Sequence, residues 1–113
     1  MQISDTELEQ LVRNGESFRV EFKETLEGSA PTAIREAVCA FANDLPGSGE
    51  AGVVFVGVRD NGEPVGIDIT DRMLTQLSDI KTDGNIVPPA SMLVEKRTLL
   101  GTNMAVITVV PSD

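Results

Sequence analysis

The sequence predicts a single α+β or α/β domain, in which a mixed sheet of about five strands packs against two or three helices. Three observations carry this prediction. Residues 53–58 and 103–110 are almost wholly apolar and rich in β-branched residues, which is typical of strands buried inside a sheet. Residues 4–15, 31–43 and 70–83 carry apolar residues at helical spacing. A chain of 113 residues has the size of one ordinary domain.

The composition indicates a soluble cytoplasmic protein with no membrane partner. Hydrophobic residues make up 41% and charged residues 24% of the chain, as in globular domains. No apolar run approaches the roughly 20 residues that span a bilayer, and the first residues lack the features of a signal peptide. The single cysteine, Cys39, allows no internal disulfide and is expected to be a buried or half-buried thiol.

The charge balance limits the functions open to the chain. Its 9 basic and 18 acidic residues give a net charge of −9, which opposes binding of a polyanion unless basic residues gather locally. The absence of histidine excludes a His-dependent triad and a histidine metal ligand within this chain. The chain has no Trp or Tyr, so only its four Phe residues could stack on nucleobases. Of these, Phe22, Phe41 and Phe55 lie in sequence patterns typical of core residues.

The first helix leads directly into the strand that carries the candidate site. Ser4 and Glu7 form a capping box at the start of the helix, and Gly15 ends it. In the strand, Phe18, Val20 and Phe22 alternate with Arg19, Glu21 and Lys23, which predicts one apolar face and one charged face. Glu16 and Glu21 are five residues apart, so they converge only if Glu16 lies in the loop before the strand.

The middle of the chain predicts a helix, a buried strand and a hairpin. Pro31 suits the first turn of the second helix. The buried strand 53–58 is followed by Asp60-Asn61-Gly62, a signal for a type I′ hairpin turn. Residues 64–67 would return as an antiparallel strand, at an edge because Pro64 has no N–H to donate.

The last third of the chain predicts one helix and two strands. Thr70 can cap the helix, and the strands 91–99 and 103–110 follow, joined by a turn at Gly101. We expect strand 103–110 to expose an unpaired edge or to pair with a second copy, because the chain ends just after it. The expected core consists of Phe22, Ile34, Val38, Phe41, Val54, Phe55, Val56, Leu74, Leu77, Val106 and Ile107.

Four blocks of this sequence, taken in order, resemble one family. They are Glu16-Ser17…Glu21-Phe22-Lys23, Ala40-Phe41-Ala42-Asn43, Val56-Gly57-Val58…Asp60-Asn61-Gly62…Val65-Gly66-Ile67, and Ile86-Val87-Pro88-Pro89. Together they are similar to the Schlafen AlbA-type domain, which occurs widely in bacterial transcriptional-regulator-like proteins. The resemblance implies an Alba-like fold and a DNA-binding role.

The resemblance also implies a second role, because Schlafen proteins include RNA-cleaving members. By motif position, their acidic cleavage site falls on Glu16, Glu21 and Asp60. Three carboxylates around a small cavity can hold Mg²⁺ or Mn²⁺, and the metal can activate water for attack on a phosphate. On the structural alternative, Glu21 pairs with a nearby cation such as Lys23, and Asp60 serves its own turn.

Three functions therefore stay open. The first is a DNA-binding domain without a cofactor, in which Arg19, Lys23, Arg35 and Arg59 form a basic stripe, with DNA favoured over RNA. The second is a divalent-metal-dependent endoribonuclease at the acidic trio. The third is a protein-interaction or homo-oligomerisation domain without nucleic acid, which the net charge of −9 favours. In each case we expect residues 1–113 to form one domain, the N-terminal part of a longer protein.

Overall fold

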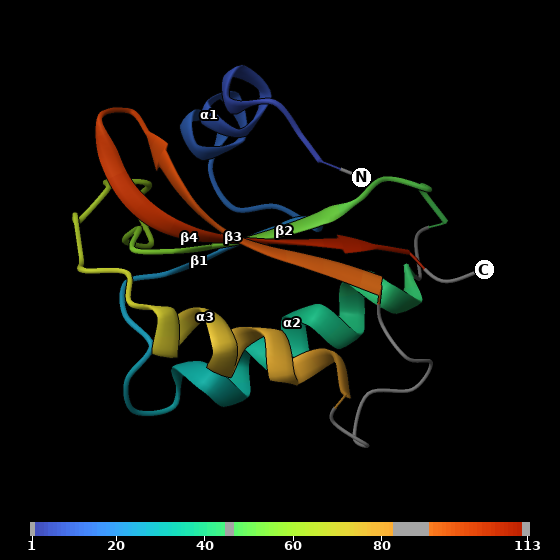
Figure 1. Cartoon of the computed structure of the whole chain (residues 1–113). Coiled ribbons are helices and arrows are strands. Elements are labelled where there is room, and N and C mark those ends of the chain that lie inside the picture. Colours follow the sequence, from blue (N-terminus) through green and yellow to red (C-terminus); the bar gives the residue numbers. More distant parts are fainter. Residues whose placement is uncertain (1, 45–46, 83–90, 112–113) are drawn as a thin grey trace.

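A single sheet separates one helix on one face from two helices on the other (Figure 1). The computed structural model describes residues 2–44, 47–82 and 91–111. The helices are α1 (Asp5–Asn14), α2 (Ala30–Asn43), α3 (Asp71–Ser78) and the 3-10 helix η1 (Asp79–Thr82). The strands are β1 (Val20–Lys23), β2 (Gly52–Val56), β3 (Ser91–Leu99) and β4 (Thr102–Val110). The predicted α+β domain with a mixed sheet is confirmed.

The strand order in the sheet is β1-β2-β4-β3. β1 and β2 are parallel, whereas β4 is antiparallel to both of its neighbours, β2 and β3. The prediction that strand 103–110 exposes an unpaired edge or pairs with another copy is therefore wrong. Residues 104–109 are all buried. A strand that is apolar on both faces is most stable inside the sheet, where both faces are shielded from water. The edges are formed instead by β1 and β3.

The described part of the sheet has four strands instead of the predicted five, because residues 64–67 do not form one. Their pairing with the end of β2 is limited to a bridge between Val58 and Pro64 and one bond from Val65 N to Gly57 O at 2.8 Å. Proline contributes no donor there, and Gly66, with φ of +75°, turns the chain away.

The hairpin turn at residues 60–62 is present, but it is not of type I′. Arg59 N donates to Glu63 O at 2.9 Å, so the loop between them has three residues. Positive φ occurs in this loop only at Gly62, at +88°. A three-residue loop needs just one left-handed residue, after a type I turn, whereas type I′ would need two.

Each face of the sheet carries its own apolar core. On the α1 face, Phe22 and Phe55 are fully buried and meet edge to face, with ring centroids 5.9 Å apart. On the other face, α2 packs against β2 and β4 and α3 lies against β3, and residues such as Ile34 and Leu77 belong to one shared core. The predicted core is confirmed except for Leu74, which is half-buried because α3 lies against the edge strand β3.

Local signals in the sequence set the helix ends. Ser4 Oγ accepts a hydrogen bond from Glu7 N at 3.3 Å, and Thr70 Oγ1 accepts one from Met73 N at 3.2 Å. Cys39 is half-buried on α2, as expected. The family block at residues 86–89 lies outside the described residues. None of the helices that the structure describes is long and apolar enough to cross a membrane.

Candidate functional site

The loop before β1 folds back along the outer edge of that strand. Ser17 N donates to Val20 O at 3.1 Å and Val20 N donates to Ser17 O at 3.3 Å, which closes a tight turn over residues 17–20. The turn places Glu16 beside β1, where its Oε2 accepts a hydrogen bond from Phe22 N at 2.9 Å. Because β1 is an edge strand, this bond satisfies a backbone donor that points away from the sheet.

Glu16 and Glu21 come together at this edge, since Glu16 lies in the loop before the strand. Partial burial is the main cause that raises the pKa of Glu21, followed by its hydrogen bond to the Glu16 carboxyl group and the negative charge there. The Lys23 ammonium, with Nζ 3.5 Å from Glu21 Oε1, lowers the same pKa but does not offset these effects. Two of the three acidic residues predicted as a cleavage site are thus in contact.

Asp60 lies in the exposed hairpin turn after β2. Within residues 2–44, 47–82 and 91–111, no three Asp, Glu, Cys or His side chains gather closely enough to hold a metal ion. The described side chains therefore form no ready-made set of three ligands for the Mg²⁺ or Mn²⁺ ion that the nuclease hypothesis requires. Glu21 has its Lys23 partner and Asp60 lies in its own turn, as the structural alternative expects.

Three of the four predicted basic residues lie along β1 and the adjoining end of β2, and each is paired with an acid. Arg19 Nε donates to Ala51 O at 2.9 Å and lies 3.8 Å from Glu50 Oε2. Lys23 pairs with Glu21, as described above. Arg59 pairs through Nε with Glu24 at 3.4 Å and through Nη1 with Glu63 at 3.1 Å. The fourth, Arg35, is half-buried on α2.

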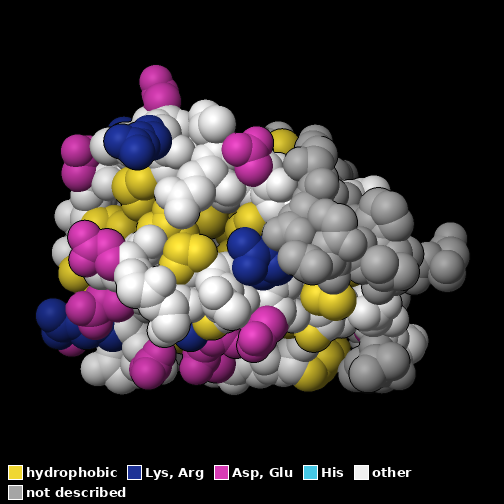
Figure 2. Space-filling view, turned by 90° about the horizontal axis from the view of Figure 1, so that it is seen from below, with side chains coloured by type: hydrophobic (Ala, Val, Ile, Leu, Met, Phe, Trp, Pro, Cys, Tyr) yellow, Lys and Arg dark blue, Asp and Glu magenta, His cyan; other side chains and the backbone are white. Residues whose placement is uncertain are grey.

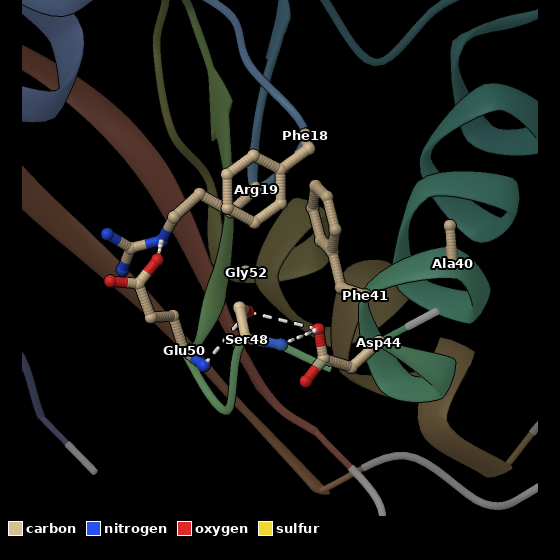
Figure 3. A pocket seen from close by; sticks show the side chains of 8 residues that line it. All are labelled: Phe18, Arg19, Ala40, Phe41, Asp44, Ser48, Glu50 and Gly52. Atoms are coloured by element: carbon tan, nitrogen blue, oxygen red, sulfur yellow. Dashed lines mark hydrogen bonds and ion pairs between the residues drawn. The ribbon is translucent and has the colours of Figure 1, made fainter. Parts of the chain in front are cut away.

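Phe18 is a surface residue, although the alternating pattern predicted it on the buried face of the strand. The turn at residues 17–20 starts before the strand and carries Phe18 and Arg19 at its tip. The Phe18 ring lies beside Phe41 of α2 and over a hollow of about 20 Å³ (Figure 3). Its side chain is 60% exposed, the one large apolar residue so exposed among those described. The alternating pattern of side chains does not predict that Phe18 is exposed, because it does not show at which residue the strand begins.

We expect Glu21→Gln to raise the melting temperature at about pH 7 and to leave it unchanged well below pH 4.5. The folded-state pKa of Glu21 is raised above 4.5, so its protonated form favours folding below pH 4.5, and this contribution is lost as the pH rises through the folded-state pKa. Glutamine keeps the neutral form at every pH. The gain should be small, because water screens a side chain that is 33% exposed.

Thermal unfolding of both proteins across this pH range measures the difference. Both chains share all other titrating groups, so their common acid sensitivity cancels in the comparison. A variant less stable than the parent chain at pH 7 would show that the Lys23 pair outweighs the repulsion from Glu16.

The architecture defines a layered α/β/α domain whose exposed parallel edge strand carries paired acidic and basic side chains. The model of the family described as Schlafen, AlbA_2 matches residues 16–113, and the chain belongs to this family. The resemblance seen in the sequence is thereby confirmed. A comparison with curated proteins gave no match.

Two solved structures share the fold. The chain is similar to the N-terminal domain of a protein from Nitrosomonas europaea. That protein is described as related to the ATP-dependent DNA helicase RecG. The identity is 26% and the TM-score 0.62, over 99% of this chain and 76% of that one. The DIP2311 protein from Corynebacterium diphtheriae matches with 18% identity and a TM-score of 0.54, over 95% of this chain and 25% of that one, which concerns the fold alone.

Proposed function

We propose that the chain is a nucleic-acid-binding domain of a bacterial transcriptional-regulator-like protein, acting on DNA in the cytoplasm. Membership of the AlbA_2 family and likeness to a domain of a RecG-related protein support an association with nucleic acid. The observation that carries the proposal is the row of cations along the edge strand: Arg19 precedes β1, Lys23 is its last residue, and Arg59 lies beyond the end of β2.

The ion pairs in this row are weak enough to be exchanged for phosphates. The carboxylates that hold Arg19 and Arg59 are more than half exposed, with side-chain values of 53% for Glu50 and Glu24 and 59% for Glu63. The two Arg59 pairs, in which both partners are about half exposed, contribute about 0–1 kcal/mol each. A phosphate oxygen can therefore replace such a carboxylate at little cost.

The face of the helix layer is a poorer place for a polyanion. Figure 2 shows apolar side chains on the face below α2 and α3, with many acidic side chains and a few basic ones around them. A hollow of about 280 Å³ on the chain is lined by apolar residues, such as Met73, together with the acidic residues Glu27 and Asp68. Phosphates would meet like charge there, so the sheet edge is the preferred surface.

The affinity should be modest and sensitive to salt. Three phosphate contacts give a slope of about −2.7 for log K against log salt, which is an affinity loss of about 40-fold between roughly 50 and 200 mM salt. The net charge of −9 weakens binding further. Fluorescence anisotropy with labelled duplex DNA and hairpin RNA tests this, and DNA should bind more tightly.

Variants around Arg59 test the surface. Arg59→Ala should reduce the salt slope by about 1, because one phosphate contact is lost. Glu63→Gln should strengthen binding, because it frees Arg59 and removes a negative charge. Lys96→Ala removes the same charge from an exposed position on the opposite edge strand, β3, and should leave the slope unchanged. Equal effects of Arg59→Ala and Lys96→Ala would refute the assigned surface.

Ribonuclease activity at Glu16, Glu21 and Asp60 is the second candidate, favoured by the contact between Glu16 and Glu21. The same titration with hairpin RNA and Mn²⁺ separates it from binding. Under the proposal the RNA stays intact. Cleavage that Glu21→Gln abolishes would establish the nuclease instead. No binding at low salt, together with a dimer in sizing chromatography, would favour the interaction domain.

A further inference from the structure

Phe18 occupies a position that neither the fold nor the turn requires. It is 60% exposed and lies outside both apolar cores. Turn positions favour Gly, Pro, Asn, Asp and Ser for conformational or hydrogen-bonding reasons, and phenylalanine offers none of these. The turn therefore gives no conformational reason for an aromatic ring at its tip, and most of this ring faces the solvent.

The turn that carries Phe18 is held firmly. Beside the two backbone bonds between Ser17 and Val20, Ser17 Oγ accepts a hydrogen bond from Arg19 N at 3.3 Å. Phe41 of α2, itself 8% exposed, lies beside the Phe18 ring on the inner side (Figure 3). A ring supported in this way loses little further freedom when a ligand covers its outer face.

Arg19 places a cation next to this ring. Its Nε donates to Ala51 O at 2.9 Å, its side chain is 20% exposed, and its 3.8 Å pair with the half-exposed Glu50 is long and therefore weak. The other acid at the hollow, Asp44, is engaged within its own loop, where it accepts bonds from Ser48 N, Ser48 Oγ and Gly49 N at 2.8–3.2 Å. These bonds lower the pKa of Asp44 and occupy its oxygens.

We propose that Phe18 is a stacking platform for an unpaired nucleobase, with Arg19 binding the adjacent phosphate, so that the turn at residues 17–20 takes single-stranded DNA. The inference rests on the proposed nucleic-acid function and extends it to a single DNA strand bound at the N-terminal end of β1. An aromatic face beside a cation is the combination that single-stranded binding sites use, because every base offers a π-face and every linkage a charge. Duplex DNA keeps its bases stacked and has none free for Phe18.

The test is binding of a single-stranded oligonucleotide that contains 2-aminopurine, compared with the same sequence as a duplex. Phe18→Ala should weaken binding of the single strand by between about 5-fold and 150-fold, the range for loss of one stacked base. It should also abolish the quenching of 2-aminopurine fluorescence on binding. Phe18→Trp should retain both, and duplex affinity should be the same for all variants.

Phe18→Leu is the matched control, because it keeps apolar bulk without an aromatic face. It should bind the single strand as weakly as Phe18→Ala. Full affinity in Phe18→Leu, or in Phe18→Ala, would overturn the platform while leaving the proposed nucleic-acid function intact. A parent chain that binds neither the single strand nor the duplex would overturn both. All variants should melt like the parent, because an exposed side chain contributes little to stability.

Discussion

Replacing Phe41 with alanine should lower the free energy of unfolding by about 3–5 kcal/mol, the usual cost of emptying a buried phenylalanine site. Phe41 lies on α2 in the core that this helix forms with β2 and β4, and it is 8% exposed. Loss of the ring removes apolar surface from the core and leaves a cavity. The rigid sheet next to α2 has little freedom to fill that cavity. Urea unfolding should show a lower midpoint with an unchanged slope.

Phe18→Ala is the natural control for this experiment. It makes the same chemical change on the neighbouring ring, but at a side chain that is 60% exposed. Its effect should stay within about 0.5 kcal/mol. If Phe41→Ala cost less than about 1 kcal/mol, the assignment of this face of α2 to the core would be refuted.

Gly52→Ala should be the second most disruptive change, at about 1–3 kcal/mol for overpacking. A Cβ at position 52 would lie 2.2 Å from Cγ and 2.5 Å from Cβ of Phe41. Rotating the ring does not relieve the contact with Phe41 Cβ, so α2 would have to move away from the start of β2. Thermal unfolding of the variant should show a clear loss of melting temperature.

A double mutant tests whether the cost comes from this one contact. In the Phe41→Ala background, Gly52→Ala should cost less than in the parent chain, because the ring atoms are gone and only the Cβ contact remains. Gly28→Ala is the comparison: nothing lies within 4 Å of its added Cβ, and its cost is confined to backbone strain at φ of +62°. Its effect should be additive with Phe41→Ala. Additive costs for Gly52→Ala would exclude the proposed clash.

At the candidate site, sequence reasoning reached the residues but not their arrangement. The blocks around Glu16, Glu21 and Asp60 identified the family. The spacing of Glu16 and Glu21 showed that they can meet only if Glu16 lies in the loop before the strand. Whether Asp60 joins them depends on the turn after β2, whose geometry follows from the three-residue loop ending at Gly62. The ion pair of Arg19 with Glu50 joins residues that are distant in sequence, so no local pattern could predict it.

The sequence by itself determined the helices, their caps, the two strands that are apolar on both faces and nearly all of the core. These features follow from side-chain periodicity and from hydrogen bonds within a few residues, which any short segment carries with it. The tertiary structure alone decided the strand order, which placed β4 inside the sheet, and the turn that moved Phe18 from the core to the surface. Which strand lies at an edge depends on how all the strands compete for pairing partners, and a local sequence pattern contains no information about that competition.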